Sequence, residues 1–228
     1  MGALSGMTGH NGGVSEHRLP DWLRPVADRA GGLTMEALTR VPTPPADARP
    51  AAVLMLFADG RRGPEILLTR RGADLRHHAG QISFPGGGAD PGDTGPADTA
   101  LREANEEVGL DPATVDVFGE LPTLWLPPSN FAVTPVLGYW TEPAELASTS
   151  EIEVVEVLHQ PIAELVDPAH RFSVTHPSGW IGPAFDVGLD VPLWGFTAGL
   201  VARLFEAVGW ERPWDASDHR ELPAAAWQ

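Results

Sequence analysis

The sequence predicts an α/β or α+β domain. Several short apolar segments, some continuous and some alternating with polar residues, are typical of buried or half-buried strands. Two longer segments, 97–109 and 194–210, carry apolar residues at helical spacing. The chain shows no internal repeat, and its 228 residues suit one domain with extensions.

The first two strands of this domain are expected to form a hairpin. AAVLMLFA (51–58) is continuously apolar, as in a buried strand, and EILLTR (65–70) follows it after the turn sequence DGRRGP. Further strand-like segments lie at 115–126, 131–140, 153–162 and 171–187, with a short helix or turn at 163–170.

The ends of the chain differ in composition from the middle. Residues 1–48 are expected to form an N-terminal extension that is partly disordered, with short helices in 19–41 and a proline-rich linker at its end. The main domain is expected to span 49–212, and 213–228 to form a C-terminal tail.

The charge excludes some classes of protein. A formal net charge of −16 argues against nucleic-acid binding, and all 15 basic residues are arginines. No run of about 18 apolar residues occurs, so no membrane span is expected. The absence of cysteine and of a signal-like start leads us to expect a cytoplasmic protein, either monomeric or a homodimer.

The helix predicted at 97–109 carries three glutamates close together. At 100° per residue, Glu103, Glu106 and Glu107 lie opposite the apolar stripe of the helix. One interpretation is a solvated acidic face. The other is a site for a divalent cation, because Glu103 and Glu107 repel each other at i,i+4 spacing and Mg²⁺ prefers carboxylate oxygens. The preceding glycine-rich loop favours the second, since side-chain-free backbone can approach a metal or a phosphate.

This segment resembles the signature of the Nudix hydrolases. The matching residues are Arg102, Glu103, Ala104, Glu106, Glu107, Gly109 and Leu110. The outer glutamate of the signature is missing, and its place is taken by Thr94 or by Asp93, depending on which glycine starts the count. The resemblance implies an α/β/α sandwich with a mixed β-sheet. It also implies Mg²⁺ or Mn²⁺ held by Glu103, Glu106 and Glu107, with the carbonyl of Gly87.

The segment 67–87 resembles a second signature, that of the coenzyme A branch of the family. Gly72 departs from it, where the branch has Ser or Ala. Arginine offers a fork of donors suited to phosphate oxygens. The resemblance and this chemistry imply that the following residues bind substrate: Arg70, Arg71, Arg76, Gly80, Phe84, Gly86 and Gly87.

Together the two signatures imply hydrolysis of the diphosphate of coenzyme A or acyl-CoA to 3′,5′-ADP and (acyl-)4′-phosphopantetheine. Glu103 or Glu151 is expected to accept the proton of the attacking water. Two alternatives stay open. In the first, the enzyme cleaves another substrate, such as ADP-ribose, NADH or a nucleoside triphosphate. In the second, the domain binds a nucleotide without cleaving it.

Overall fold

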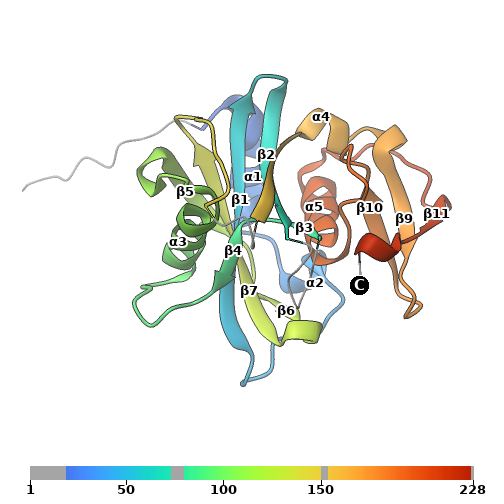
Figure 1. Ribbon diagram of the computed structural model, residues 1–228, viewed down its shortest axis with the longest axis horizontal. Coiled ribbons are helices and arrows are strands. Elements are labelled where there is room, and N and C mark those ends of the chain that lie inside the picture. Colours follow the sequence, from blue (N-terminus) through green and yellow to red (C-terminus); the bar gives the residue numbers. More distant parts are fainter. Residues whose placement is uncertain (1–18, 73–79, 150–153, 227–228) are drawn as a thin grey trace, which may run out of the picture.

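The computed structural model describes residues 19–72, 80–149 and 154–226 (Figure 1). The strands are β1 (Arg49–Gly60), β2 (Gly63–Arg71), β3 (Ile82–Ser83), β4 (Gly86–Gly88), β5 (Val115–Glu120), β6 (Leu124–Leu126), β7 (Phe131–Trp140), β8 (Val154–Pro161), β9 (Arg171–Thr175), β10 (Ile181–Phe185) and β11 (His219–Glu221). The α-helices are α1 (Arg24–Ala30), α2 (Met35–Leu38), α3 (Pro96–Val108), α4 (Ile162–Leu165) and α5 (Gly195–Val208).

The larger sheet is mixed. Its main order is β3-β2-β1-β7-β5, with β4 paired to β1, β6 to β7 and β8 to β2. The predicted hairpin is confirmed, because β1 and β2 pair antiparallel from Phe57 opposite Ile66 to Gly60 opposite Gly63. On its other side β1 runs parallel to β7.

Two helices cover the two faces of this sheet (Figure 1). Side chains alternate along β1, so Leu54 and Leu56 pack in the cluster that contains α3, whereas Met55 and Phe57 pack in the cluster that contains α5. All four of these side chains are fully buried. Burial on both faces explains why the sequence of β1 is continuously apolar. The predicted α/β/α sandwich is confirmed.

Two of the predicted β segments are interrupted. The segment 115–126 divides into β5 and β6 because Pro122, which lacks a backbone N–H, lies between them. The segment 171–187 forms the hairpin β9–β10, whose turn is closed by a hydrogen bond from the His176 N–H to the Trp180 carbonyl (2.8 Å). The strand predicted at 131–140 and the helix predicted within 194–210 are both present.

The segments on either side of 49–212 pack against the rest of the chain. In the N-terminal segment, the Trp22 indole donates a hydrogen bond to Asp59 in β1 (2.8 Å), and Arg29 in α1 donates to the carbonyl of Ala207 in α5 (3.0 Å). At the C-terminal end, β11 runs parallel to β9 in a separate three-stranded sheet. No helix in the described ranges is long and apolar enough to cross a membrane.

Candidate active site

The glutamates predicted to act together lie on α3. Gly95 precedes the helix, Pro96 occupies its first turn, where no N–H is needed, and Gly109 ends it in the left-handed conformation (φ 71°). Its buried face, which includes Ala100 and Ala104, packs against β1. The helix predicted at 97–109 is therefore confirmed, and its polar side faces the loop that precedes it.

The three glutamates have different surroundings. The side chain of Glu106 is 58% exposed, that of Glu103 is 19% exposed and that of Glu107 is 8% exposed. The Glu107 carboxylate accepts a hydrogen bond from the Gly86 N–H (3.2 Å) and lies 3.8 Å from the Arg71 guanidinium. The three carboxylates therefore do not share one open face, because Glu107 is enclosed between α3, β4 and β2.

The glycine loop approaches the carboxylates as the sequence suggested. A Cβ on Gly87 would lie 2.5 Å from the Glu103 carboxyl carbon, so this carboxylate occupies the space that any side chain at Gly87 would need. The neighbouring Gly86 has φ 153°, and a Cβ there would lie 2.3 Å from the carbonyl oxygen of Ala52 in β1. The backbone of β1 therefore requires glycine at Gly86, whereas a side chain at Gly87 would displace the Glu103 carboxylate.

Arg102 holds the loop and the helix together. Its Nε and Nη2 donate to the two oxygens of Asp93 (3.1 Å each), and Nη2 also donates to the carbonyl of Gly88 (2.9 Å). Its Nη1 contacts both Glu103 (3.0 Å) and Glu106 (3.2 Å). The guanidinium thus brings one oxygen of Glu103 and one of Glu106 close to the same point.

The structure decides which residue stands in for the missing outer glutamate. Asp93 bonds to Arg102 and accepts a further hydrogen bond from the Thr99 hydroxyl (2.8 Å). Thr94 bonds instead to Asp98, through its hydroxyl and its N–H, and so takes no part in holding Arg102. The hydrogen bonds from Arg102 hold the pKa of the Asp93 carboxyl well below its usual value. Asp93 is therefore an anion near neutral pH and anchors Arg102.

The Glu103 carboxyl has the opposite shift. Its burial raises its pKa above the usual 4.5, although the hydrogen bond from Arg102 opposes the change. A carboxylate with a raised pKa is a better proton acceptor near neutral pH than an ordinary one. The Glu103 carboxylate thus lies against the Gly87 backbone, and its raised pKa suits it to accept a proton.

The side chains fit a divalent cation in part. Mg²⁺ binds one or two carboxylates and keeps several waters, so it would need the oxygens of Glu103 and Glu106 that are not paired with Arg102. Glu107 is turned toward Gly86 and Arg71. Within the described ranges no group of three or more His, Asp or Glu side chains is arranged to hold a metal. The expected three-glutamate set is therefore not gathered in this structure.

The residues predicted to bind substrate do not all lie in one place. Arg71 lies beside Glu107, but Arg70 points to the other face of the sheet, where it forms an ion pair with Asp190 (2.8 Å) in the loop before α5. Phe84 is buried in the core on the α5 side. Gly80 follows the undescribed stretch and precedes β3. Arg76 and Glu151 lie outside the described residues.

Comparison with known proteins shows which family has this arrangement of residues. The NUDIX domain family matches residues 48–175, which contain β1, the glycine loop and α3. The chain belongs to the Nudix hydrolase family. It is an enzyme, a hydrolase of phosphoanhydride bonds.

Relatives of this Nudix hydrolase occur in enterobacteria. It is 38% identical over 172 residues to the uncharacterized Nudix hydrolase NudL of Yersinia enterocolitica, covering 72% of this chain and 83% of the relative. The NudL of Escherichia coli is 39% identical over 168 residues, covering 71% and 83% respectively. Among solved structures, the Nudix hydrolase RenU of M. smegmatis has a TM-score of 0.51 at 22% identity, covering 74% of this chain and 90% of RenU, and it shows the same fold.

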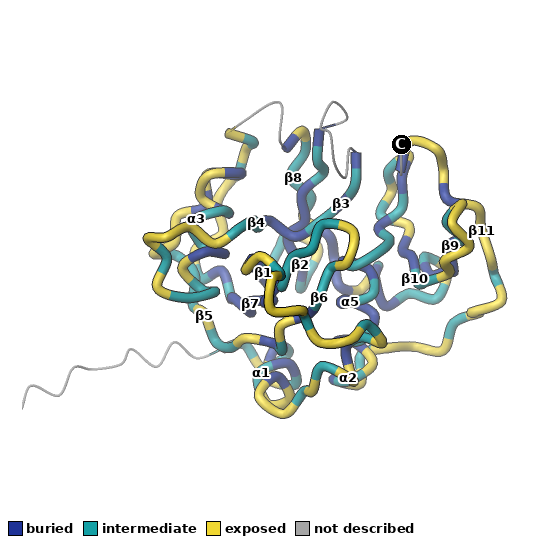
Figure 2. Tube along the Cα trace, turned by 90° about the horizontal axis from the view of Figure 1, so that it is seen from below, coloured by how far each residue is buried: buried dark blue, intermediate teal, exposed yellow. Residues whose placement is uncertain are grey.

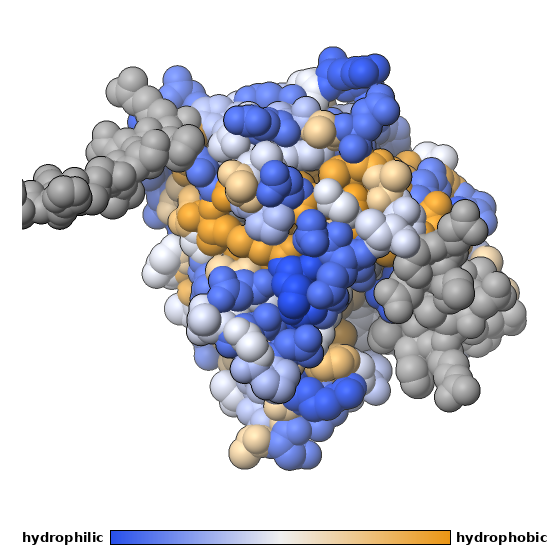
Figure 3. All heavy atoms as spheres, turned by 60° about the vertical axis from the view of Figure 1, so that its left-hand side comes forward, coloured by the Kyte–Doolittle hydropathy of each residue, from blue (hydrophilic) through white to orange (hydrophobic). Residues whose placement is uncertain are grey.

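The α3 side of the enzyme is polar. Figure 3, which brings this side forward, shows a largely hydrophilic face crossed by a band of apolar atoms. Such a face agrees with the charged side chains of Glu103, Glu106 and Arg102.

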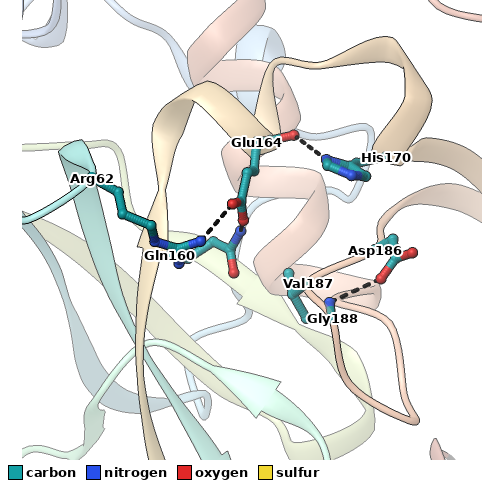
Figure 4. Close-up of a pocket in the computed structure, with 7 residues that line it drawn as sticks. All are labelled: Arg62, Gln160, Glu164, His170, Asp186, Val187 and Gly188. Carbon is teal, nitrogen blue, oxygen red and sulfur yellow. Dashed lines mark hydrogen bonds and ion pairs between the residues drawn. The ribbon is translucent and has the colours of Figure 1, made fainter.

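A small cavity that the sequence did not reveal lies elsewhere in this Nudix hydrolase (Figure 4). It has a volume of about 340 Å³ and contains none of the predicted site residues. Glu164 is at its centre and accepts hydrogen bonds from Arg62 (2.6 Å) and Gln160 (2.9 Å). Its carboxylate is thus already paired, and the residues of this cavity lie up to 126 positions apart, from Arg62 to Gly188, so no local motif marks it.

Proposed function

We propose that this Nudix hydrolase cleaves the diphosphate bond of coenzyme A or acyl-CoA, releasing 3′,5′-ADP and 4′-phosphopantetheine or its acyl form. The observation that carries the proposal is the position of Arg71. This arginine belongs to the segment that resembles the coenzyme A signature, and its guanidinium lies 3.8 Å from Glu107 of the glutamate helix. Substrate recognition and catalysis would therefore meet at one place.

The glutamates and the glycine loop would hold the metal and the diphosphate. Glu103 and Glu106 would supply carboxylate oxygens to Mg²⁺ or Mn²⁺, with Glu107 and the Gly87 carbonyl as further ligands. The bound cation would neutralise the diphosphate oxygens and lower the pKa of a water. Asp93 would keep Arg102 in place, and through it the carboxylates of Glu103 and Glu106.

Two residues are candidates for the proton acceptor. Glu103 has a raised pKa, which suits the role. Glu151, which lies outside the described residues, is the other candidate; Thr149, two positions before it in the sequence, donates its N–H to the Glu107 carbonyl at the end of α3 (3.0 Å). Thr149 also bonds through its hydroxyl to the Glu106 carbonyl.

The other proposed substrate contacts are Arg70, Arg76, Gly80 and Gly86, whereas Phe84 is buried in the core and is not proposed to touch the substrate. Arg71 and Arg76 would bind phosphate oxygens, and Gly86 would give the diphosphate access to the backbone. Arg70, which is paired with Asp190, would contribute from the other face of the sheet. We propose that the enzyme acts in the cytoplasm, because its chain contains no cysteine.

A substrate panel tests the proposal. Free coenzyme A, ADP-ribose, NADH and a nucleoside triphosphate are incubated with Mg²⁺, Mn²⁺ or EDTA, and the products are separated by chromatography. We expect metal-dependent release of 3′,5′-ADP, fastest from coenzyme A. Faster cleavage of another diphosphate would refute the coenzyme A assignment and keep the Nudix chemistry.

A pair of variants tests the metal site in the same assay. Glu106→Gln should lower turnover about 100-fold or more, because a metal ligand is worth several kcal/mol in the transition state. Glu145→Gln, at an exposed position outside α3, serves as the matched control and should leave turnover unchanged. Unchanged turnover in Glu106→Gln would remove that residue from the proposed site.

A further inference from the structure

The C-terminal segment, expected from the sequence to be a tail, is built into the fold. Leu222 and Ala226 are buried (5% and 0% exposed), and β11 pairs with β9. The family match ends at Thr175, so this segment and the hairpin turn after β9 lie outside the part that the family shares.

This segment lies against the coenzyme A signature. The Gln81 side chain donates a hydrogen bond to the Ala226 carbonyl (3.3 Å), and a Cβ on Gly80 would lie 3.2 Å from the Ala225 carbonyl oxygen. Figure 2 shows the resulting order along one side of the molecule: α3, then β4, then β3, then the C-terminal end and the three-stranded sheet. The C-terminal segment therefore lies between the coenzyme A signature and the three-stranded sheet.

A cavity lies beside this C-terminal segment. It has a volume of about 710 Å³ and is formed between the turn of the β9–β10 hairpin and the C-terminal segment. This volume is within the range of about 300–1,000 Å³ that is usual for small-molecule sites. Ala224, one of its lining residues, is the neighbour of the Ala225 that touches Gly80. The cavity and the signature are thus joined by adjacent residues.

The hairpin wall of the cavity is held by aromatic contacts. The ring of His176, which lines the cavity, stacks on Trp194 at 5.7 Å with an interplanar angle of 17°. Trp180 packs on the same Trp194 at 6.2 Å. Trp194 directly precedes α5, so these ring contacts pack the hairpin turn against the start of a core helix.

The lining indicates what kind of group fits. Leu222, Pro223, Ala224 and Pro177 supply apolar surface, and the residues described as lining the cavity include no arginine. Their acidic side chain, Glu221, would repel a phosphate. Phosphates are therefore expected at Arg71, and an uncharged, largely aliphatic group in the cavity.

We propose that this cavity binds the acyl-pantetheine end of an acyl-CoA, with the acyl chain against Leu222, Pro223 and Ala224. The proposal rests on the proposed function, because it assigns the far end of the same substrate. It makes the C-terminal segment a determinant of acyl preference.

Binding of S-hexanoyl-pantetheine alone, which has no diphosphate and no nucleotide, tests the cavity by calorimetry. The wild-type protein should bind it, and Ala224→Trp, which fills the cavity from an exposed position, should weaken binding about tenfold or more. Ala113→Trp is the matched control, since Ala113 is exposed and follows α3 on the other side of the molecule. Ala224→Glu, a smaller change that adds a second carboxylate, should weaken binding as well.

A kinetic measurement separates this proposal from the proposed function. Ala224→Trp should raise KM for hexanoyl-CoA about tenfold with kcat unchanged, and inhibition by 3′,5′-ADP should not change. No binding to the wild-type protein, or equal binding by wild type and Ala224→Trp, overturns the cavity assignment even if coenzyme A is hydrolysed. Binding that Ala224→Trp removes, without hydrolysis of any coenzyme A ester, overturns the proposed function and leaves the cavity assignment standing.

Discussion

The α3 region and the C-terminal region of this enzyme are built in different ways. Around α3, one guanidinium bonds to three carboxylates and a carbonyl, all within residues 88–106. The C-terminal cavity joins residues 175–179 to residues 221–224. The first region is charged and local in sequence, and the second is largely apolar and assembled from distant segments.

The chemistry and the choice of substrate are therefore encoded in different parts of the chain. Hydrolysis of a diphosphate needs charged groups at fixed spacing, which one loop and one helix can provide. Recognition of an uncharged chain needs a shaped cavity, which requires packing between segments. Changes near α3 should therefore affect every substrate, and changes near the C-terminus should affect acyl esters or stability.

Among substitutions that leave the glutamates of α3 in place, Gly87→Ala should reduce activity the most. Gly87→Ala places a Cβ where the Glu103 carboxylate lies, and because that carboxylate is the end of a side chain, it moves and the fold is kept. Displacing a catalytic group by about 1 Å can cost about 100-fold in rate, so kcat should fall by that amount on all substrates.

Gly92→Ala is the control for this change. No atom lies within 4 Å of a Cβ at Gly92, which is in the same loop. Steady-state kinetics and thermal unfolding of both variants give the comparison. Equal activity of Gly87→Ala and wild type would show that Glu103 need not occupy the position seen here.

The next effect is at Asp93. Asp93→Asn removes the charge that holds Arg102, and loss of such a supporting interaction typically costs about 10–100-fold in activity or metal affinity. Asp98→Asn, which changes another carboxylate of the same region, should cost less than twofold, since Asp98 bonds to Thr94 and not to Arg102. Similar losses in both variants would contradict an anchoring role specific to Asp93.

Acid unfolding tests the same residue by its charge. The folded protein holds the pKa of Asp93 below its usual 3.8, so the carboxylate stabilises the fold above that pH and the contribution is lost as the pH falls further. The wild type should thus have a higher free energy of unfolding than Asp93→Asn at neutral pH. The difference between the two should become smaller below about pH 4. Thermal unfolding of both proteins across this pH range measures the difference in stability. A difference that does not change with pH would show that the charge of Asp93 is not its cause.

The smallest effect on catalysis is expected at Arg171 in β9. Its buried guanidinium bonds to Glu211 (2.7 Å) and lies over the rings of Phe185 and Trp214. Arg171→Met should lower the free energy of unfolding by about 1–3 kcal/mol, because a hydrogen bond to a charged group is lost. At a temperature where the variant is folded, kcat on free coenzyme A should stay within about twofold of wild type.

Arg203→Met is the control for Arg171. Arg203 forms an exposed pair with Glu206 on α5, and such pairs contribute about 0–1 kcal/mol. Denaturant unfolding of the two variants compares a buried arginine with an exposed one. A large loss of kcat in Arg171→Met would show that the C-terminal region takes part in the chemistry, and would break the contrast between the two regions.

From the sequence alone, the helices α3 and α5, the strands β1, β2 and β7, and the match to the family signatures could be predicted. The apolar spacing of Ala97, Leu101, Ala104 and Val108 predicted α3, and the continuous apolar run of β1 predicted a buried strand. These features follow from contacts between near neighbours in the chain, which periodicity records.

The tertiary structure alone decided which of these residues meet. It enclosed Glu107 beside Arg71, turned Arg70 to the other face of the sheet and selected Asp93 over Thr94 as the partner of Arg102. It also brought Ala226 against Gln81, across 145 positions of the chain. The physical reason is that burial and pairing depend on how distant segments pack, and the spacing of residues within one segment carries no record of that packing.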